Sequence, residues 1–249
     1  MLNIWLYSIV SVIIVSLVSL VGAITLAIKI ERLKKFLILF VGFSAGALLG
    51  GAFFHLLPEL VSEFGYNLKT GSLLVAGIMA FFVLEKYVHW QHCHDIDCEQ
   101  HPKHLAIMNL VGDGVHNFLD GVIIATSYLI SLPLGLAATL AIIFHEIPQE
   151  IGDFGILLHS GFSKAKAILY NLLSASIAIL GVVIGLVLGE SVSSFTFYML
   201  PLAVSGFFYI ALSDLLPELH KENKLSKSLL QFLVIIFGIF LMYLLTFLE

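Results

Sequence analysis

Long apolar segments follow one another along almost the whole of this 249-residue chain. A helix needs about 20 mostly apolar residues to cross the hydrocarbon core of a bilayer. On that criterion the sequence predicts eight membrane-spanning helices, at about residues 4–28, 36–61, 71–91, 104–130, 132–160, 165–189, 194–218 and 226–248. We therefore expect an all-α polytopic membrane protein in which residues 1–249 form a single transmembrane domain.

The composition supports a lipid environment. Only 12% of the residues are charged and 59% are hydrophobic, whereas a soluble domain carries roughly a quarter charged residues. So little polar surface disfavours soluble enzymes and disordered proteins, and the net charge of −5 disfavours a nucleic-acid partner. The first span differs from a signal peptide because its apolar run is too long and its cations follow it.

The lysines and arginine predict the topology. Of the 12 cationic residues, only Lys69 lies outside the regions in or beside the loops after the first, third, fifth and seventh spans. Basic residues in short loops mark the cytoplasmic side of a membrane. The sequence therefore predicts a multi-pass protein of the plasma or inner membrane, with both termini on the outer side.

A short string occurs twice. Leu-Leu-Pro-Glu-Leu stands at residues 56–60 and again at 215–219, near the ends of the second and seventh spans. These two spans run in opposite directions, so the copies lie at opposite faces. This placement predicts an inverted repeat of spans 1–3 and 6–8 around spans 4 and 5, a 3+2+3 plan common in transporters. A chance match of a leucine-rich string is the alternative.

Polar residues form a stripe along each of the two central spans. In the fourth span they are spaced i, i+3, i+4, i+7, and in the fifth span i, i+1, i+4, i+5, i+8, so each set shares one helix face. The connection around residues 131–133 is short, so the two spans are antiparallel neighbours whose stripes can face each other. The members are Asp113, His116, Asn117, Asp120, His145, Glu146, Gln149, Glu150 and Asp153.

The free-energy cost of placing these polar groups inside the bilayer indicates that they bind or carry a ligand. Each carboxylate at the bilayer centre costs about 2.5–3.5 kcal/mol, so a divalent cation, water or shared protons must compensate. Imidazole, carboxylate and amide ligands suit zinc, iron and manganese. No cysteine joins them, which disfavours a closed structural zinc site. Pro148 breaks the fifth span among these groups, as expected where a helix lines a cavity.

Two stretches resemble the signature motifs of the ZIP family of divalent-metal transporters. They are His-Asn-Phe-Leu-Asp-Gly at residues 116–121 and His-Glu-Ile-Pro-Gln-Glu-Ile-Gly-Asp-Phe at residues 145–154. The resemblance extends to the chain length, the eight spans, the outer termini, the His-bearing loop and the Leu-Pro-Glu end of the seventh span. It implies a binuclear metal centre midway across the membrane.

Carried over residue by residue, the resemblance implies one metal position formed by His116, Asp120, His145 and Gln149. It implies a second position formed by Asn117, Asp120, Glu146 and Gln149. The closest branch of the family has His where this chain has Gln149. A neutral amide is a weaker ligand and cannot bridge two ions as a carboxylate can, so we expect one dominant metal position.

Further polar residues extend towards both faces and are candidates for a transport pathway. They are Asp113, Glu150, Asp153, His55 and Asp214. For each of them an interfacial residue in contact with water is the alternative. Between the third and fourth spans, the loop at residues 89–104 has a composition that binds soft and borderline metals. We expect it to form a cytosolic metal-capture site with His89, His92, Cys93, His94, Cys98 and His101.

The sequence thus predicts a transporter that carries divalent cations into the cytoplasm. Zinc is the expected substrate, with iron, manganese and cadmium as further candidates, and no fixed cofactor is expected. The alternative is an intramembrane zinc metallohydrolase, because His145-Glu146 resembles the opening of a His-Glu-x-x-His helix. An ion channel lined by the same stripes is a third hypothesis. A homodimer is left open.

Overall fold

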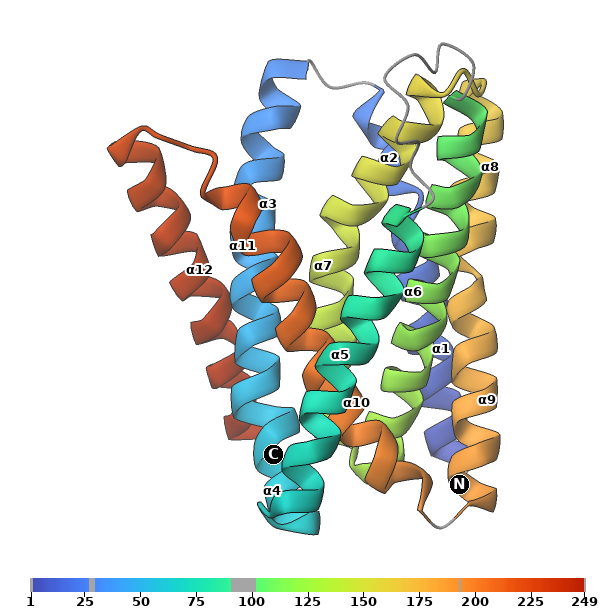
Figure 1. Cartoon of the computed structure of the whole chain (residues 1–249), viewed down its shortest axis with the longest axis vertical. Helices are drawn as coiled ribbons and strands as arrows, with labels where there is room; N and C mark the ends of the chain where they lie inside the picture. Colours follow the sequence, from blue (N-terminus) through green and yellow to red (C-terminus); the bar gives the residue numbers. More distant parts are fainter. Residues whose placement is uncertain (1, 27–29, 91–101, 193, 249) are drawn as a thin grey trace.

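A computed structural model describes residues 2–26, 30–90, 102–192 and 194–248, with only the backbone described at 30–36, 38, 87–90, 102–105, 108 and 248. These residues are helical apart from short connections, and no strand occurs among them (Figure 1). In chain order the elements are α1 (Leu2–Val18), α2 (Val21–Thr25), α3 (Ile30–Gly51), the π-helix η1 (Ala52–Leu56), α4 (Leu57–Phe64), α5 (Leu68–Trp90), α6 (Pro102–Ile130), α7 (Leu132–His159), α8 (Lys164–Ala175), α9 (Ile177–Ser191), α10 (Phe195–Tyr209), the π-helix η2 (Ile210–Leu215), α11 (Leu216–Leu219), α12 (Leu225–Leu245) and the 3₁₀-helix η3 (Thr246–Leu248).

Seven segments of the described chain are long and apolar enough to cross a membrane. They are α1 with α2, α3 with η1 and α4, α5, α7, α8 with α9, α10 with η2 and α11, and α12. The all-α, polytopic prediction is therefore confirmed. The predicted fourth span, α6, is 29 residues long but is not among the seven, and it carries one of the two polar stripes. The eighth crossing therefore stays a prediction.

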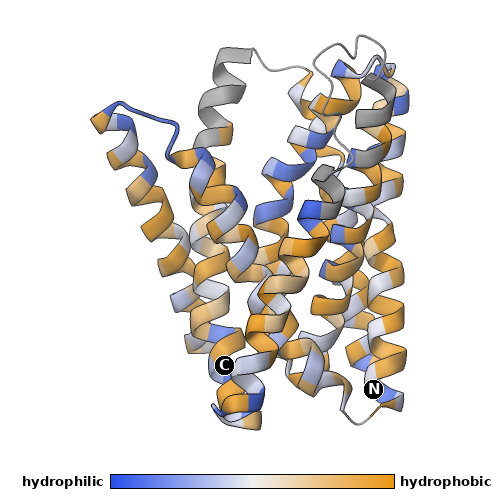
Figure 2. Cartoon of the chain, in the orientation of Figure 1, coloured by the Kyte–Doolittle hydropathy of each residue, from blue (hydrophilic) through white to orange (hydrophobic). Residues whose placement is uncertain are grey.

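The long helices run side by side as a bundle, and both chain ends lie at the same end of it (Figure 1). Within the bundle, α6 packs most extensively against α9 and α7, α3 packs against α12, and α10 packs against α5. Figure 2 shows apolar residues over most of α12 and α9, and hydrophilic ones in the half of α7 away from the chain ends. The outer helices thus offer an apolar surface to lipid, and polar groups gather near the central helices.

Glycines determine how closely α6 approaches α9. A Cβ on Gly121 of α6 would collide with the Ala178 carbonyl oxygen, and a Cβ on Gly181 of α9 would collide with the Phe118 carbonyl oxygen. Small residues allow such close backbone contact between membrane helices. This contact fixes the rotation of α6 about its axis, so that its polar face is turned towards α7.

The two Leu-Leu-Pro-Glu-Leu strings lie in matching structural contexts. In each copy the first Leu ends a π-helix, η1 or η2, and the second begins the next helix, α4 or α11. α4 lies at the end of the bundle that holds the chain termini, and α11 lies towards the opposite end (Figure 1). The pairings of α3 with α12 and of α10 with α5 also correspond under the predicted exchange of spans 2 and 8 with 7 and 3. These parallels support the inverted repeat.

Candidate metal site

The candidate site lies between α6 and α7, halfway along both helices. A single residue, Ser131, connects them, and its hydroxyl accepts a hydrogen bond from the Leu134 amide at 3.3 Å, which caps α7. The two helices therefore run antiparallel, as the short connection predicts. His116 is near the middle of α6 and His145 near the middle of α7, so their side chains meet at the same depth.

Four side chains converge here, and we call them the four-ligand group: His116, Asp120, His145 and Glu146. The two imidazole Nε2 atoms are 3.1 Å apart. From His116 Nε2 the distances are 3.7 Å to the Asp120 carboxylate and 3.5 Å to Glu146. From His145 Nε2 the corresponding distances are 3.2 and 3.4 Å.

These distances match the edges of a zinc coordination tetrahedron. Zinc binds imidazole nitrogen and carboxylate oxygen at about 2.0–2.2 Å, so neighbouring ligand atoms of a tetrahedral site are about 3.3–3.6 Å apart. The five distances above lie within a few tenths of an ångström of that range. Five of the six distances among the four ligand atoms are therefore close to the spacing that a single zinc ion requires, and the sixth is within 4.8 Å.

Burial and unmet hydrogen bonding also indicate a cation. Asp120, His145 and Glu146 are about 1% exposed. Asp120 Oδ2 and both Glu146 carboxylate oxygens are buried without a hydrogen-bond partner among the described residues, although the imidazole Nε2 atoms lie 3.2–3.7 Å from Asp120 Oδ2 and Glu146 Oε1. An uncompensated carboxylate is costly in lipid, and a bound divalent cation would remove that cost.

A contact with the helix backbone orients the His145 imidazole for metal binding. Its Nδ1 lies 3.2 Å from the Ala141 carbonyl oxygen. Because a carbonyl only accepts, Nδ1 donates in this contact, and Nε2 is the ring nitrogen that faces the four-ligand group. A hydrogen bond on the second ring nitrogen is the usual way in which a metal-binding His is held.

A second set of carboxylates, which we call the carboxylate group, adjoins the first: Asp113, Glu146 and Glu150. Glu146 belongs to both groups. Asn171 of α8 donates a hydrogen bond to Glu150 Oε2 at 2.5 Å. The remaining oxygens Asp113 Oδ2 and Glu150 Oε1 have no hydrogen-bond partner among the described residues.

The two amides of the predicted site are both turned towards Asp113. Gln149 Nε2 lies 3.4 Å from Asp113 Oδ1, and Asn117 Nδ2 lies 2.9 Å from the same atom. The Asn117 carbonyl oxygen is buried and has no hydrogen-bond partner in the described structure. Of the predicted ligands, the structure thus brings together the two imidazoles with Asp120 and Glu146, while Gln149 and Asn117 support Asp113.

A polar cavity of about 220 Å³ leads away from these groups. It is bordered by α5, α6, α7 and the α10–η2 junction. Its polar lining residues are Glu85, Asn109, Asp113, His116, Gln149, Asp153, Tyr209 and Asp214. On α6 and α7 these residues lie on the side of the site away from the α6–α7 turn. The cavity therefore extends towards the N-terminal end of α6 and the C-terminal end of α7, where the cation-rich loops are.

The five predicted pathway residues do not all lie at the cavity, and one of them, Glu150, belongs to the carboxylate group. Asp113, Asp153 and Asp214 line the polar cavity, and the Asp153 carboxylate accepts a hydrogen bond from Asn109 at 3.0 Å. His55, in contrast, is buried against α12, where its Nε2 lies 2.8 Å from the Met242 carbonyl oxygen, and it belongs to neither group. His92, Cys93, His94, Cys98 and His101 lie outside the described residues, as does the side chain of His89.

Three polar residues of the cavity were missed by sequence reasoning. Asn109 continues the polar stripe of α6 at the helical spacing of Asp113 and His116. Extending the predicted stripe by one turn towards the N-terminus of α6 would have included it. Glu85 and Tyr209, which are hydrogen-bonded to each other, come from α5 and α10. No periodicity in the sequence links those two helices to the site.

Comparisons with known proteins show the family to which this chain is related. The family model described as ZIP Zinc transporter matches residues 2–104 and 90–246. "Zinc transporter ZIP13 homolog" of Drosophila melanogaster is 30% identical over 86% of this chain and 78% of its own length. "Zinc transporter zipt-7.1" of Caenorhabditis briggsae is 30% identical over 86% of the chain and 72% of its own length.

A further relative, "Zinc transporter ZIP13" of Pongo abelii, is 35% identical over 82% of this chain and 65% of its own length. The matches extend through α6 and α7 and through most of the helices around them. They therefore include the four-ligand group together with the scaffold that positions it. This chain belongs to the ZIP zinc transporter family.

Proposed function

We propose that this protein transports divalent metal cations into the cytoplasm, with zinc as the main substrate and iron, manganese and cadmium as further candidates. The observation that carries the proposal is the four-ligand group, whose nitrogen and oxygen atoms have tetrahedral zinc spacing halfway along α6 and α7. A mixed set of imidazole and carboxylate ligands without thiolate favours an ion that must leave again.

The polar cavity supports an inward direction of release. It connects His116 with Asp214 and Glu85, towards the ends with the cation-rich loops, which we place in the cytoplasm. On the other side of the site, α6 and α7 contribute buried apolar residues, among them Ile124 and Ile142. A polar cavity on one side and buried apolar residues on the other support alternating exposure of the site rather than a continuous channel.

The shared carboxylate of Glu146 offers a route for the ion. An ion held by the four-ligand group can pass to the carboxylate group without Glu146 releasing it, because Glu146 belongs to both. From there Asp153 and Asp214 line the cavity. A chain of several moderately strong sites lets an ion enter and leave, as conduction requires.

The enzymatic alternative finds no support. The relatives reported above are named as transporters, and family membership assigns the chain to transport rather than to catalysis. In the structure, Gln149 stands where a His-Glu-x-x-His helix needs its second His, and its amide contacts Asp113.

Uptake of radioactive zinc into proteoliposomes tests the proposal. We expect His145→Ala to lower uptake at limiting zinc at least about tenfold, because even the hydrogen-bond partners of metal ligands are worth about 10–100-fold in affinity. His220→Ala is the matched control, since His220 is an exposed His just beyond α11, and it should leave uptake unchanged. Equal uptake by wild type and His145→Ala would contradict the proposal.

A further inference from the structure

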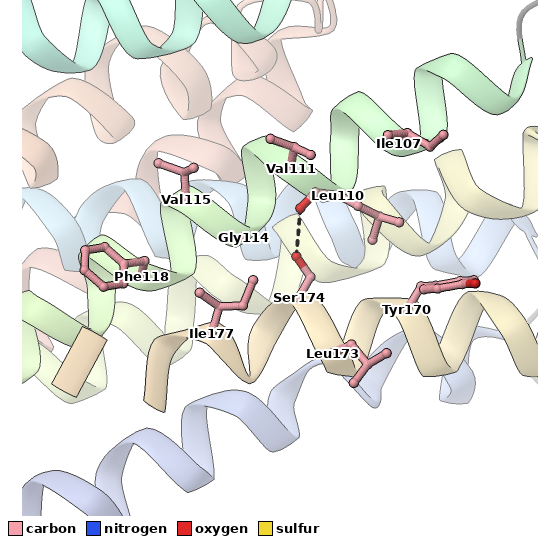
Figure 3. Close-up of a pocket in the computed structure, with 10 residues that line it drawn as sticks. All are labelled: Ile107, Leu110, Val111, Gly114, Val115, Phe118, Tyr170, Leu173, Ser174 and Ile177. Atoms are coloured by element: carbon pink, nitrogen blue, oxygen red, sulfur yellow. Dashed lines mark hydrogen bonds between the residues drawn. The ribbon is translucent and has the colours of Figure 1, made fainter. Parts of the chain in front are cut away.

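A groove runs along the outer surface of α6 and the α8–α9 pair, on the side of α6 away from the metal site. Its volume is about 550 Å³ and its lining is almost entirely apolar. Figure 3 shows Phe118 and Ile177 at one end and Ile107 and Tyr170 at the other. The groove is therefore elongated along the helices, in the direction in which a lipid chain lies in a bilayer.

The floor of the groove is made by small residues. Gly114 has no side chain to fill it, and Ser174 is buried, with its hydroxyl donating to the Leu110 carbonyl oxygen at 3.0 Å (Figure 3). The rims, by contrast, are exposed: Val111 is 52% and Leu173 is 54% exposed. Large exposed apolar side chains around a notch form a surface that is stable only in contact with apolar material.

At its end nearest the cation-rich loops, the groove is followed by polar and basic side chains instead of apolar ones. Tyr170 and Lys166 are four residues apart on α8, so Lys166 continues the groove-lining face of α8 by one turn. Lys164 and Lys166 are both exposed and stand in the first turn of α8, where the helix dipole also favours an anion. Tyr at such a boundary typically marks the membrane interface.

We propose that this groove binds one anionic phospholipid, with an acyl chain between α6 and α8–α9 and the phosphate at Lys164 and Lys166. The charge of the two lysines selects an anionic headgroup, and the apolar walls select the chain. The proposal depends on the membrane position of the helices and not on the metal site. Because Gly114 adjoins Asp113, the lipid contacts the back of the helix that carries His116.

Native mass spectrometry of the full-length protein in detergent tests the proposal. The probe is an equimolar mixture of dioleoyl phosphatidylglycerol and dioleoyl phosphatidylcholine. Two lysines near an anionic headgroup predict that phosphatidylglycerol is retained roughly 25-fold over phosphatidylcholine. The double variant Lys164→Gln/Lys166→Gln should bring the two lipids close to parity. Lys224→Gln/Lys227→Gln removes the same charge at the start of α12 and should keep the preference.

A second pair of variants tests the groove itself. Val111→Trp fills it from an exposed rim position, so the fold is retained, and it should reduce retention of both lipids. Val75→Trp, on the exposed face of α5, should not. The proposal is overturned if wild type shows no headgroup preference, if both lysine pairs act alike, or if Val111→Trp retains lipid normally. It is also overturned if Val111→Trp converts a dimer to a monomer, because a second copy then fills the groove.

Discussion

At the scale of single residues, Glu146 and Gln149 have different tasks although both lie in the second signature stretch. Glu146 contributes to both the four-ligand group and the carboxylate group. Gln149 is turned towards Asp113, with its amide nitrogen 3.4 Å from the carboxylate. A neutral amide that donates to a carboxylate adds no negative charge and competes with a cation for the same oxygen. This arrangement favours a single dominant metal position.

Replacing Gln149 by His tests the single-position expectation. An imidazole at this position adds a strong ligand beside Asp113 and removes an amide donor from it. We expect Gln149→His to raise the zinc content of the purified protein from about one towards two ions per chain, since each added imidazole favours binding of a borderline metal. Elemental analysis after equilibrium dialysis measures the content.

The control for this experiment is Gln231→His. Gln231 is also buried, but it lies on α12 and outside both groups. This variant should keep the wild-type zinc content. Unchanged zinc content in Gln149→His would contradict the role we assign to Gln149.

At the scale of helices, α6 is positioned by backbone contact on one side and by the site on the other. Gly121 follows Asp120 directly, and it approaches the Ala178 carbonyl of α9 without room for a Cβ. Gly121, directly beside the ligand Asp120, therefore anchors α6, the helix that supplies two of the four members of the four-ligand group. The distances within that group depend on this contact.

Gly121→Ala is expected to destabilise the protein and to weaken zinc binding together. A Cβ at this position meets backbone atoms, which cannot move aside, and overpacking of this kind costs about 1–3 kcal/mol. Thermal unfolding in detergent and zinc titration measure the two effects. Gly152→Ala on α7 is the matched control, because open space surrounds its Cβ position. Equal behaviour of the two variants would contradict the role of the α6–α9 contact.

At the scale of the whole molecule, the polar cavity approaches the site from one end of the bundle. The polar cavity extends from His116 to Asp214, whereas the α6–α7 turn lies at the end of the bundle that holds both chain termini (Figure 1). The cation distribution predicts that this end lies on the outer side of the membrane. On this predicted orientation, the polar cavity of the described conformation opens towards the cytoplasm.

Labelling of introduced cysteines with a membrane-impermeant maleimide tests this sidedness in vesicles of known orientation. In a background with Cys93 and Cys98 replaced by Ser, Asp214→Cys should react only with reagent on the cytoplasmic side. Leu132→Cys, at the exposed start of α7, should react only from the opposite side. Labelling of both positions from the same side would refute the assignment.

Much of this molecule follows from local sequence. Apolar runs of the required length determine the helices, and most begin and end within a few residues of the predicted spans. The largest shift is at α3, which begins at Ile30 rather than near residue 36. The stripes of α6 and α7 and their antiparallel pairing also follow, because helical periodicity and a one-residue connection are local properties.

The first predicted span contains a helix break that the local sequence does not predict. It is divided into α1 and α2 at residues 19–20, next to Asn171 of α8, whose amide donates to the Ser19 carbonyl at 3.3 Å. The sixth span is likewise divided, at Ser176. Hydropathy does not reveal these interruptions, because the freed backbone groups are satisfied by partners far away in the chain.

By itself, the sequence determined the helices, the family resemblance and the residues available as ligands. Only the tertiary structure decided which atoms converge: it joined Glu146 to the two imidazoles, turned Gln149 to Asp113, and placed His55 against α12. It also brought Glu85 of α5 to the polar cavity. The physical reason is that the rotation of each helix is set by close packing against distant segments, as Gly121 is against α9, and no periodicity within one helix encodes that contact.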